Sequence, residues 1–287
     1  MNRKRRPPPM IQVEDLQKHY GDHPALSGVS FVVAPMEIYG YLGPNGAGKT
    51  TTIRILTGLT QRDGGNVKLN GCSIDHNPIK YKSQFGIVPQ YPNLDLDLSV
   101  ENNLFIHGRL YGMSRREITR RCNELLDEMG LAEKRRVSVK KLSGGQKRRL
   151  LIARALLHHP KIVFMDEPSV GLDPAIRRGL WGIIKKIKED GATIFLTTHY
   201  IDEAEFLADR VAFLDAGRIV AEGKPTDLMA EIGVWAIDIL QSNRIQSFYF
   251  QTRQEANQWA ASQEKEFTLR RVNLEDAFLT KTGRKVT

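Results

Sequence analysis

A glycine-rich segment that ends in lysine and threonine has the residue types needed to hold phosphate groups. The run Gly43-Pro44-Asn45-Gly46-Ala47-Gly48-Lys49-Thr50 fits the pattern GxxxxGK[ST], and Thr51 follows it directly. Glycines let successive backbone N–H groups approach phosphate oxygens, and a helix that begins at such a loop adds its positive N-terminal end. We therefore expect Lys49 to reach the terminal phosphates and the Thr50 hydroxyl to bind Mg²⁺. The apolar segments IYGYL and TIRILTGL flank the loop, as a strand and a helix should.

Two adjacent carboxylates supply a second chemical element. Asp166 and Glu167 follow the four apolar residues Ile162–Met165, which predict a buried strand. An aspartate at the end of such a strand can hold Mg²⁺ through a water, and a neighbouring glutamate can orient or deprotonate an attacking water. Taken alone, the pair would be a solvated turn, but the phosphate loop upstream favours the catalytic interpretation.

A third element lies in Leu142-Ser143-Gly144-Gly145-Gln146. Ser143 and Gln146 have the spacing of a capping box at a helix start, and the two glycines leave bare backbone amides for an anion. The chain thus has two phosphate-binding helix ends. One compact domain cannot easily bring both ends to the same phosphate.

In this order, GPNGAGKTT, LSGGQ and the strand that ends in Asp166-Glu167 resemble the nucleotide-binding subunits of ATP-binding cassette (ABC) transporters, over about residues 10–225. The resemblance implies an ATPase that uses ATP and Mg²⁺. It implies that two copies of the chain bury two ATP molecules head to tail, with LSGGQ of one copy facing the γ-phosphate held by the other. It also implies a separate integral membrane permease and a peripheral location at the cytoplasmic face of the inner cell membrane.

The resemblance assigns roles to four further residues. Tyr20 matches an aromatic residue that stacks on adenine, although an ordinary edge-strand tyrosine remains the alternative. Gln90 matches a glutamine that contacts Mg²⁺ and water, Asp173 a residue that communicates across the dimer, and His199 a histidine that contacts the γ-phosphate. The implied catalytic residues are Glu167, His199 and Lys49, and the implied metal ligands are Thr50, Gln90 and Asp166.

The rest of the pattern places these residues in an α/β fold of the P-loop NTPase type. Early β segments such as IQVEDL predict an N-terminal antiparallel β subdomain, and strands such as KIVFMDEP and TIFLTTH alternate with helices, which predicts a mostly parallel sheet. The segment RVAFLDAGRIVAEG predicts a hairpin across Ala216-Gly217. We divide the chain into a flexible basic tail (residues 1–9), a nucleotide-binding domain (10–230) with a helical subdomain (about 93–160), and a small C-terminal α/β appendage (231–287).

Composition excludes several other classes of protein. Of the 287 residues, 41% are hydrophobic and 26% charged, which is typical of a folded globular chain. No apolar run approaches the roughly 20 residues of a membrane-spanning helix. Cys72 and Cys122 are the two cysteines, so a disulfide framework is excluded and a reducing compartment is favoured. The net charge of +9 fits phosphate-rich ligands, anionic lipid or nucleic acid, and does not separate them.

Several segments resemble the exporter branch that handles drugs, lipids, polyketides or polysaccharides: LSGGQKRR, VGLDP, TTHYIDEAE and NLEDAFLTKTG. We expect the helical insert Asn93–Lys141 to receive the permease's coupling helix. The alternative is a soluble ABC ATPase that acts on nucleic acid or ribosomes. The interval between the phosphate loop and LSGGQ has no long heptad run, and the chain carries one cassette, so no nucleic acid partner is expected.

Overall fold

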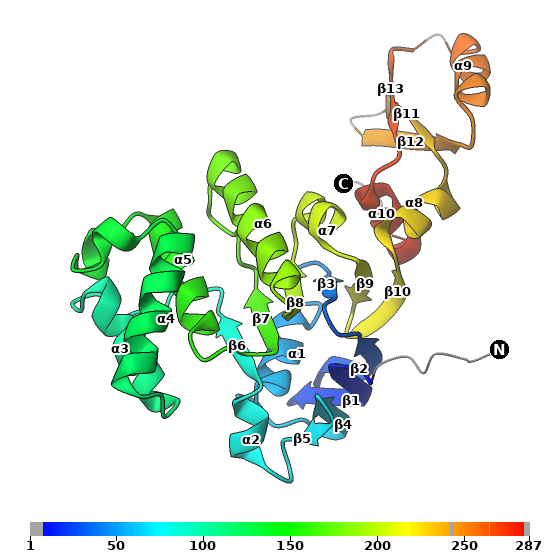
Figure 1. The fold of residues 1–287 in the computed structure, drawn as a ribbon. Coiled ribbons are helices and arrows are strands. Elements are labelled where there is room, and N and C mark those ends of the chain that lie inside the picture. The colour runs from blue at the N-terminus through cyan, green and yellow to red at the C-terminus, as the bar shows by residue number, and fades with distance from the viewer. Residues whose placement is uncertain (1–7, 242–243, 264, 284–287) are drawn as a thin grey trace, which may run out of the picture.

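The computed structural model describes residues 8–241, 244–263 and 265–283 (Figure 1). Residues 1–7 of the predicted tail lie outside the described residues, so the tail stays a prediction. A central sheet separates the helices of residues 100–156 at one end from the C-terminal residues 235–271 at the other (Figure 1). Within the described ranges, every helix is too short or too polar to span a bilayer.

The central sheet has six strands in the order β10-β9-β3-β8-β7-β6. The strands are β3 (Ile38–Leu42), β6 (Phe85–Val88), β7 (Ile162–Asp166), β8 (Thr193–Thr198), β9 (Arg210–Asp215) and β10 (Arg218–Gly223). All pairs are parallel except the predicted hairpin of β9 with β10, which closes one edge. Every residue of β3, β7 and β8 is buried, because apolar clusters cover both faces. The predicted α/β class with a mostly parallel sheet is confirmed.

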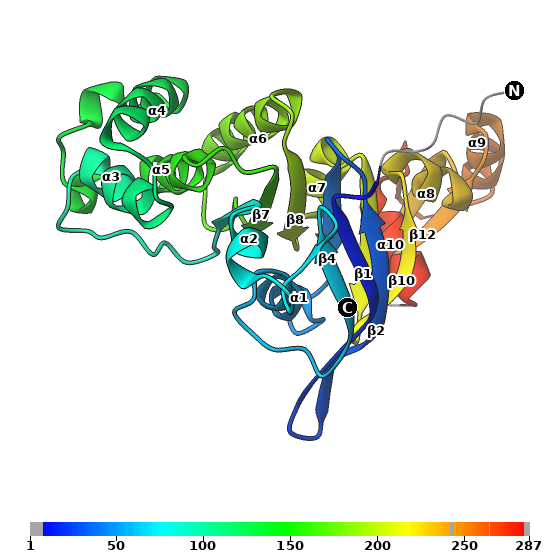
Figure 2. The same ribbon diagram turned by 60° about the horizontal axis from the view of Figure 1, so that its bottom comes forward.

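A second sheet lies beside helix α1 (Lys49–Leu56) and covers one side of the central sheet (Figure 2). It is antiparallel, with β1 (Ile11–Tyr20), β2 (His23–Val33), β4 (Gly64–Leu69) and β5 (Cys72–Ser73). An aromatic cluster joins the two sheets: the ring centroids of Phe31 and Tyr41 lie 5.5 Å and 5.3 Å from that of Phe195. This packing fixes the strand that leads into the phosphate loop. The short helix α2 (Pro78–Lys82) precedes β6.

The helical part consists of α3 (Val100–Leu110), α4 (Arg115–Glu128) and α5 (Gly144–Leu156), with 3₁₀ turns at Ala132–Lys134 and Val139–Lys141. The capping box expected at Ser143 forms, another forms at Ser114, and they set where α5 and α4 begin. Helices α6 (Pro174–Glu189) and α7 (Ile201–Leu207) follow β7 and β8. Helix α5 packs in the same apolar core as α4 and α6.

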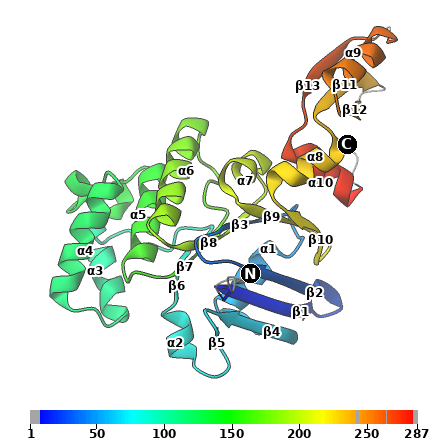
Figure 3. The same cartoon turned by 45° about the vertical axis from the view of Figure 1, so that its right-hand side comes forward.

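The C-terminal part has a sheet of its own, β12-β11-β13, with α9 against one face (Figure 3). Its elements are α8 (Pro225–Ile232), β11 (Trp235–Gln241), β12 (Arg244–Phe250), α9 (Arg253–Ala261), β13 (Phe267–Arg271) and α10 (Leu274–Thr282). Helix α10 turns back toward the main body, where Leu274 and Phe278 are buried with Phe213 of β9 and Leu228 of α8.

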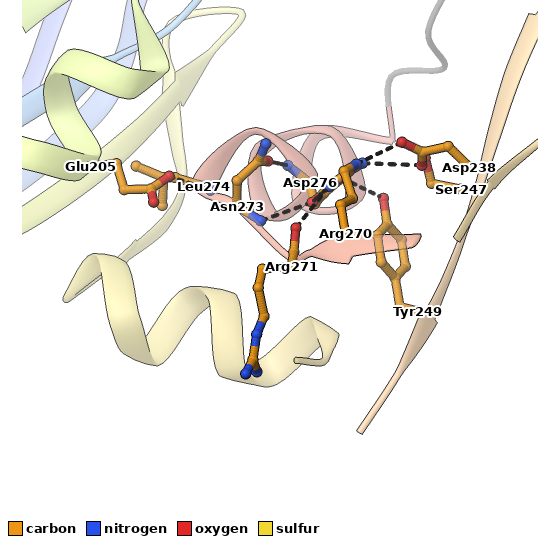
Figure 4. Close-up of polar contacts among 9 residues, drawn as sticks. All are labelled: Glu205, Asp238, Ser247, Tyr249, Arg270, Arg271, Asn273, Leu274 and Asp276. Atoms are coloured by element: carbon orange, nitrogen blue, oxygen red, sulfur yellow. Dashed lines mark hydrogen bonds and ion pairs between the residues drawn. The ribbon is translucent and has the colours of Figure 1, made fainter. Parts of the chain in front are cut away.

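One arginine ties the small sheet to α10 (Figure 4). Arg270 of β13 donates to both carboxylate oxygens of Asp238, on β11, at 2.6 and 3.1 Å. It also donates to both oxygens of Asp276, on α10, at 2.6 and 2.8 Å. Leu274 N donates to Glu205 of α7 at 2.9 Å, so α10 is held to the body as well as to the small sheet.

Candidate active site

The predicted catalytic residues all follow strands of the central sheet. The phosphate loop follows β3, His199 follows β8, Glu167 follows β7, and Gln90 lies two residues after β6. These four strands are consecutive neighbours, in the order β3-β8-β7-β6, and run parallel. Because the carboxyl ends of parallel strands meet at one edge, the four loops converge there, which is where α/β folds bind ligands.

The phosphate loop needs glycine at its close contacts. At Gly48 φ is +111°, and a Cβ there would lie 2.6 Å from the backbone oxygen of Ala25. A Cβ at Gly43 would lie 2.4 Å from the backbone oxygen of Leu214. Helix α1 begins directly after Gly48, so its free N–H groups face the loop. The loop is thus shaped by surrounding backbone to receive an anion.

Lys49 is buried within this loop, with its ammonium group aimed at the catalytic carboxylates. Its Nζ donates to the backbone oxygens of Gly43 and Pro44 at 2.7 and 3.1 Å, and lies 3.4 Å from Oε1 of Glu167. Burial lowers the pKa of Lys49, while the carboxylates of Glu167 and Asp166 oppose that change. Burial thus disfavours the charged form of Lys49, and the two carboxylates favour it.

Glu167 lies at the centre of the cluster. Its Oε2 accepts a hydrogen bond from Gln90 Nε2 at 3.1 Å and lies 3.1 Å from Nδ1 of His199. Its backbone has φ of +46°, a left-handed conformation that is rare for glutamate, and its N–H donates to the Thr197 carbonyl oxygen at 3.0 Å. Such strain is tolerated where the surroundings hold it, and it is concentrated at functional sites. The carboxylate is thus fixed between Lys49, Gln90 and His199.

Asp166 lies beside the Thr50 hydroxyl. Thr50 Oγ1 is 3.5 Å from Asp166 Oδ1, and Thr197 Oγ1 donates to the same oxygen at 2.6 Å. Burial raises the pKa of Asp166, against the effect of both hydroxyl groups. A hydroxyl and a carboxylate oxygen side by side are ligands that suit Mg²⁺. The sequence analysis did not select Thr197; the paired threonines at the end of TIFLTTH are the signal that could have found it.

A cavity of about 320 Å³ opens beside the loop. Its lining residues are Tyr20, His23, Ala25, Asn45, Gly46, Gly48, Lys49, Thr50, Thr51, Gln90 and Glu167. Tyr20, at the end of β1, is 50% exposed, so its ring is free to stack on a flat ligand. His23 at the start of β2 was not predicted. A larger cavity of about 770 Å³ lies between α4 and α6, and its lining includes none of the predicted site residues.

The remaining predicted residues lie in a second place. Ser143 Oγ accepts from Gln146 N at 3.3 Å, and Gln146 Oε1 accepts from Ser143 N at 3.0 Å. A Cβ on Gly145 would lie 2.9 Å from Ile176, in the first turn of α6, and Asp173 caps that helix by accepting from Ile176 N at 2.9 Å. Ser143, Gly144, Gly145, Gln146 and Asp173 do not line the cavity beside the phosphate loop. The helix end at Ser143 and the phosphate loop therefore do not share this cavity within one chain.

Two buried polar residues escaped the sequence analysis. Arg148, on α5, donates to the backbone oxygens of Pro89 and Gln90 at 2.7 and 3.0 Å. Glu203, on α7, accepts from Trp181 Nε1 at 3.0 Å, and burial raises its pKa. Neither has a motif of its own; Arg148 lies in the run Lys147-Arg148-Arg149, where the sequence gives no means of telling the buried arginine from the others.

Comparison with known proteins decides the family. The model of the family described as ABC transporter matches residues 26–170, from β2 to the turn after Glu167. The chain also aligns along 96% of its length, at 39% identity, with Nod factor export ATP-binding protein I of Cupriavidus metallidurans, and covers 98% of that protein. The chain belongs to the ABC transporter family.

Further relatives and solved structures agree with this assignment. The linearmycin resistance ATP-binding protein LnrL of Bacillus subtilis is 41% identical, with 78% of this chain and 72% of that protein aligned. A solved ATP-binding subunit of an ABC transporter superposes with a TM-score of 0.71 at 34% identity, covering 77% of this chain and 92% of the other. The structure of cbiO1 from Clostridium perfringens, part of the ABC transporter complex cbiONQ, gives 0.72 at 29% identity, covering 78% and 91%.

The predicted family, fold and enzyme class are thus confirmed. This ABC protein is an ATP-binding subunit whose ATPase activity is coupled to transport, and such a subunit works with a separate membrane permease. None of the relatives and structures named above is named for nucleic acid, so nothing supports the alternative of a soluble ATPase that acts on nucleic acid or ribosomes.

Proposed function

We propose that this ABC subunit hydrolyses Mg²⁺-bound ATP between two copies of itself and thereby drives export through a separate permease. The observation that carries the proposal is the position of the Glu167 carboxylate, within 3.1–3.4 Å of Lys49, Gln90 and His199 at the edge of the cavity beside the phosphate loop. A glutamate held by three polar side chains beside a phosphate loop is suited to activate water.

The residues divide the work as follows. The amides of the phosphate loop and the Lys49 ammonium bind the β- and γ-phosphates, and Tyr20 stacks on the adenine. Glu167 orients the attacking water and accepts its proton, while Gln90 and His199 hold the carboxylate and the γ-phosphate in line. Thr50, Asp166 and Gln90 would hold Mg²⁺, which supplies positive charge to the β- and γ-oxygens. Water attacks the γ-phosphorus, the bond to the bridging oxygen breaks, and ADP and phosphate leave.

The second copy follows from the two separate anion sites. Ser143 and Gly144 are exposed at the start of α5, Gly145 is buried, and this helix end does not line the cavity of its own chain. In a head-to-tail pair, this end of each copy would meet the γ-phosphate held by the other copy. Asp173 caps the neighbouring helix α6 and would lie at the same interface. ATP would then bring the copies together, and hydrolysis would release them.

The permease surface is proposed on the helical part. Ile106 and Leu110, one turn apart on α3, are 49% and 79% exposed, and Tyr91, directly after Gln90, is 79% exposed. Large exposed apolar side chains of this kind mark sites of protein contact. Because Tyr91 follows Gln90, a permease that docks on Tyr91 would be coupled to Gln90 and thus to the catalytic cluster. We therefore propose that the subunit is a peripheral protein at the cytoplasmic face of the inner cell membrane.

Export is the direction that the relatives favour. The C. metallidurans relative is named for Nod factor export and the B. subtilis relative for linearmycin resistance. We therefore propose a cargo from the drug, lipid, polyketide or polysaccharide classes. Recovery of an integral membrane protein with the detergent-extracted complex supports this function, whereas recovery of RNA or DNA instead would contradict it.

The deciding variant is Glu167→Gln. Loss of the carboxylate base should lower ATP turnover about 10²- to 10⁴-fold while ATP binding persists, because glutamine keeps the shape of the side chain and one acceptor oxygen. ATP should then trap the variant as a dimer, which light scattering measures. Normal turnover in Glu167→Gln contradicts the proposed chemistry.

The control for the dimer mixes two inactive chains. Lys49→Ala chains lack the phosphate contact, and Ser143→Arg chains block the opposing helix end. A mixed pair contains one intact site, built from the phosphate loop of one chain and Ser143 of the other. Turnover should reappear on mixing; its absence, with both variants folded, contradicts the head-to-tail arrangement.

A further inference from the structure

Arg148 is a buried arginine whose hydrogen bonds run to backbone rather than to a carboxylate. Its side chain is 5% exposed, and it donates through Nη1 to the Pro89 oxygen at 2.7 Å and through Nη2 to the Gln90 oxygen at 3.0 Å. Burial lowers the pKa of Arg148, and the charges of Glu203 and Asp166 oppose that change. Arginine is rarely buried unless its donors are used, and its planar fork fits two neighbouring acceptors at once. The two carbonyl groups are therefore held in one geometry.

The same helix holds the next part of the segment. Arg154, six residues further along α5, donates to the Asn93 backbone oxygen at 2.9 Å and to the Asn93 side chain. Residues 89–93 connect β6 to the helical part, and α5 fastens this connection at both of its ends. A displacement of α5 is thus transmitted to residues 89–93 by direct hydrogen bonds.

The contacts of Gln90 lead in two directions, through Arg148 and α5 to the helix end at Ser143, and through its side chain to Glu167. Helix α5 begins at the Ser143 capping box, in the turn that precedes Arg148. On the other side, the Gln90 side chain donates to Glu167 Oε2 at 3.1 Å. A short path of contacts therefore runs from Ser143 along α5 to Arg148, through the Gln90 backbone and side chain, to the Glu167 carboxylate.

We propose that Arg148 is a positioning residue that couples the position of the Gln90–Glu167 pair to the position of helix α5. An ATP phosphate held by the other copy and bound at the Ser143 end of α5 would then position the Glu167 carboxylate of the chain that carries this helix. Each chain would therefore hydrolyse its own ATP when its Ser143 end is occupied. Arg148 touches neither nucleotide nor water in this scheme, and it acts through Gln90. The inference rests on the role proposed above for Glu167.

Arg149 provides a matched control on the same helix. It also donates to a backbone oxygen, that of Met129, at 3.0 Å, but this bond stays within the helical part. Arg148→Met should lower kcat for ATP roughly 10- to 100-fold, while KM for ATP changes less than about twofold. Arg149→Met should keep kcat within about twofold of the original chain. Arg148→Lys keeps a cationic donor group without the planar fork, and should recover part of the lost kcat.

A double-mutant cycle with Gln90 separates positioning from a general structural role. Gln90→Ala removes the bond to Glu167 but keeps the backbone oxygen that Arg148 binds. If Arg148 acts through the Gln90 side chain, Arg148→Met should lower kcat by less than about twofold in the Gln90→Ala background. The full-length chain is used throughout, and Tm is measured for each variant. Arg148→Lys replaces Arg148→Met in the cycle if the latter fails to fold.

Three results would overturn the inference: equal loss of kcat in Arg148→Met and Arg149→Met, a change confined to KM, or the same fold-loss with and without the Gln90 side chain. Glu167→Gln identifies the source of a failure. If that variant turns over normally, the proposed function is wrong. If it is inactive and the Arg148 effects multiply independently of Gln90, only the positioning role is wrong.

Discussion

At the scale of single residues, the site depends on backbone conformations that ordinary side chains avoid. Glu167 adopts φ of +46°, and Gly46 and Gly48 adopt +82° and +111°. These positions differ in the room around them. A Cβ at Gly46 meets nothing within 4 Å, whereas one at Gly48 would lie 2.6 Å from the Ala25 oxygen and 2.8 Å from Leu26. The loop is therefore open on its ligand side and closed on its sheet side.

Gly48→Ala should consequently be more harmful than Gly46→Ala. Both variants strain the backbone by about 1–2 kcal/mol, because alanine disfavours positive φ. Gly48→Ala must in addition displace the strand β2 backbone, so ATP binding should be lost and Tm should fall by several degrees. Titration with a fluorescent ATP analogue and a thermal melt measure the two effects. Equal affinities and equal Tm values in the two variants would contradict the steric argument.

At the scale of elements, a ring cluster links the end of α3 to the end of α5. The Tyr111 and His158 rings stack with their centroids 3.8 Å apart, and the centroid of the His107 ring lies 4.9 Å from that of Tyr111. His158 Nε2 lies 3.0 Å from the Phe85 oxygen of β6, so the cluster also contacts the central sheet. Burial lowers the pKa of both His107 and His158 to about 4. Both rings are therefore neutral in the folded protein at neutral pH.

This cluster predicts an acid-dependent loss of stability. The unfolded chain takes up protons on these histidines near pH 6.5, while the folded chain resists until about pH 4. The free energy of unfolding is therefore unaffected by these rings above pH 6.5 and decreases as pH falls toward 4, by on the order of 3 kcal/mol for each ring. The double variant His107→Leu, His158→Gln should be less stable at pH 7.5, and its Tm deficit should shrink toward pH 4.5. A constant deficit across this range would refute the assignment.

At the scale of the whole molecule, Arg270 is the cation that ties the small C-terminal sheet to α10. Burial raises the pKa of Asp276, but the hydrogen bonds from Arg270 and the Asn273 backbone outweigh it, and the pKa lies below its usual range. Tyr249 donates to the same carboxylate at 3.2 Å. The small sheet, α10 and α7 are thus connected by charged and polar contacts rather than by one continuous apolar core (Figure 4).

Arg270→Met should loosen this connection without harming the catalytic site. Asp276 is 3% exposed and would lose its cation, so we expect a cost of about 2 kcal/mol, reduced from that of a fully buried pair by the partial exposure of Arg270. Hydrogen exchange at β11 amides should accelerate at least tenfold, with kcat for ATP within twofold. Arg271→Met, which removes a cation 4.0 Å from the Trp235 ring centroid, is the neighbouring control. Unchanged hydrogen exchange at the β11 amides in Arg270→Met would show that Arg270 does not hold the small sheet to α10.

The sequence by itself determined the features that depend on neighbours in the chain. The phosphate loop joins β3 to α1 as its spacing predicts, and the capping boxes at Ser114 and Ser143 close over three residues. Hydrogen bonds of such short range follow from residue type and spacing alone. Glu167 was identifiable because it follows the apolar run Ile162–Met165 downstream of a phosphate loop, and His199 was identifiable from the resemblance to the family.

Only the tertiary structure decided which distant groups pair. The order β3-β8-β7-β6 brings Thr197 onto Asp166 and Gln90 onto Glu167, and the packing of α5 selects Arg148 rather than Arg149 to hold residues 89–90. Strand order and helix rotation are set by how apolar faces are buried across the whole chain. Nothing local encodes them, so contacts between segments far apart in sequence became visible only in the folded molecule.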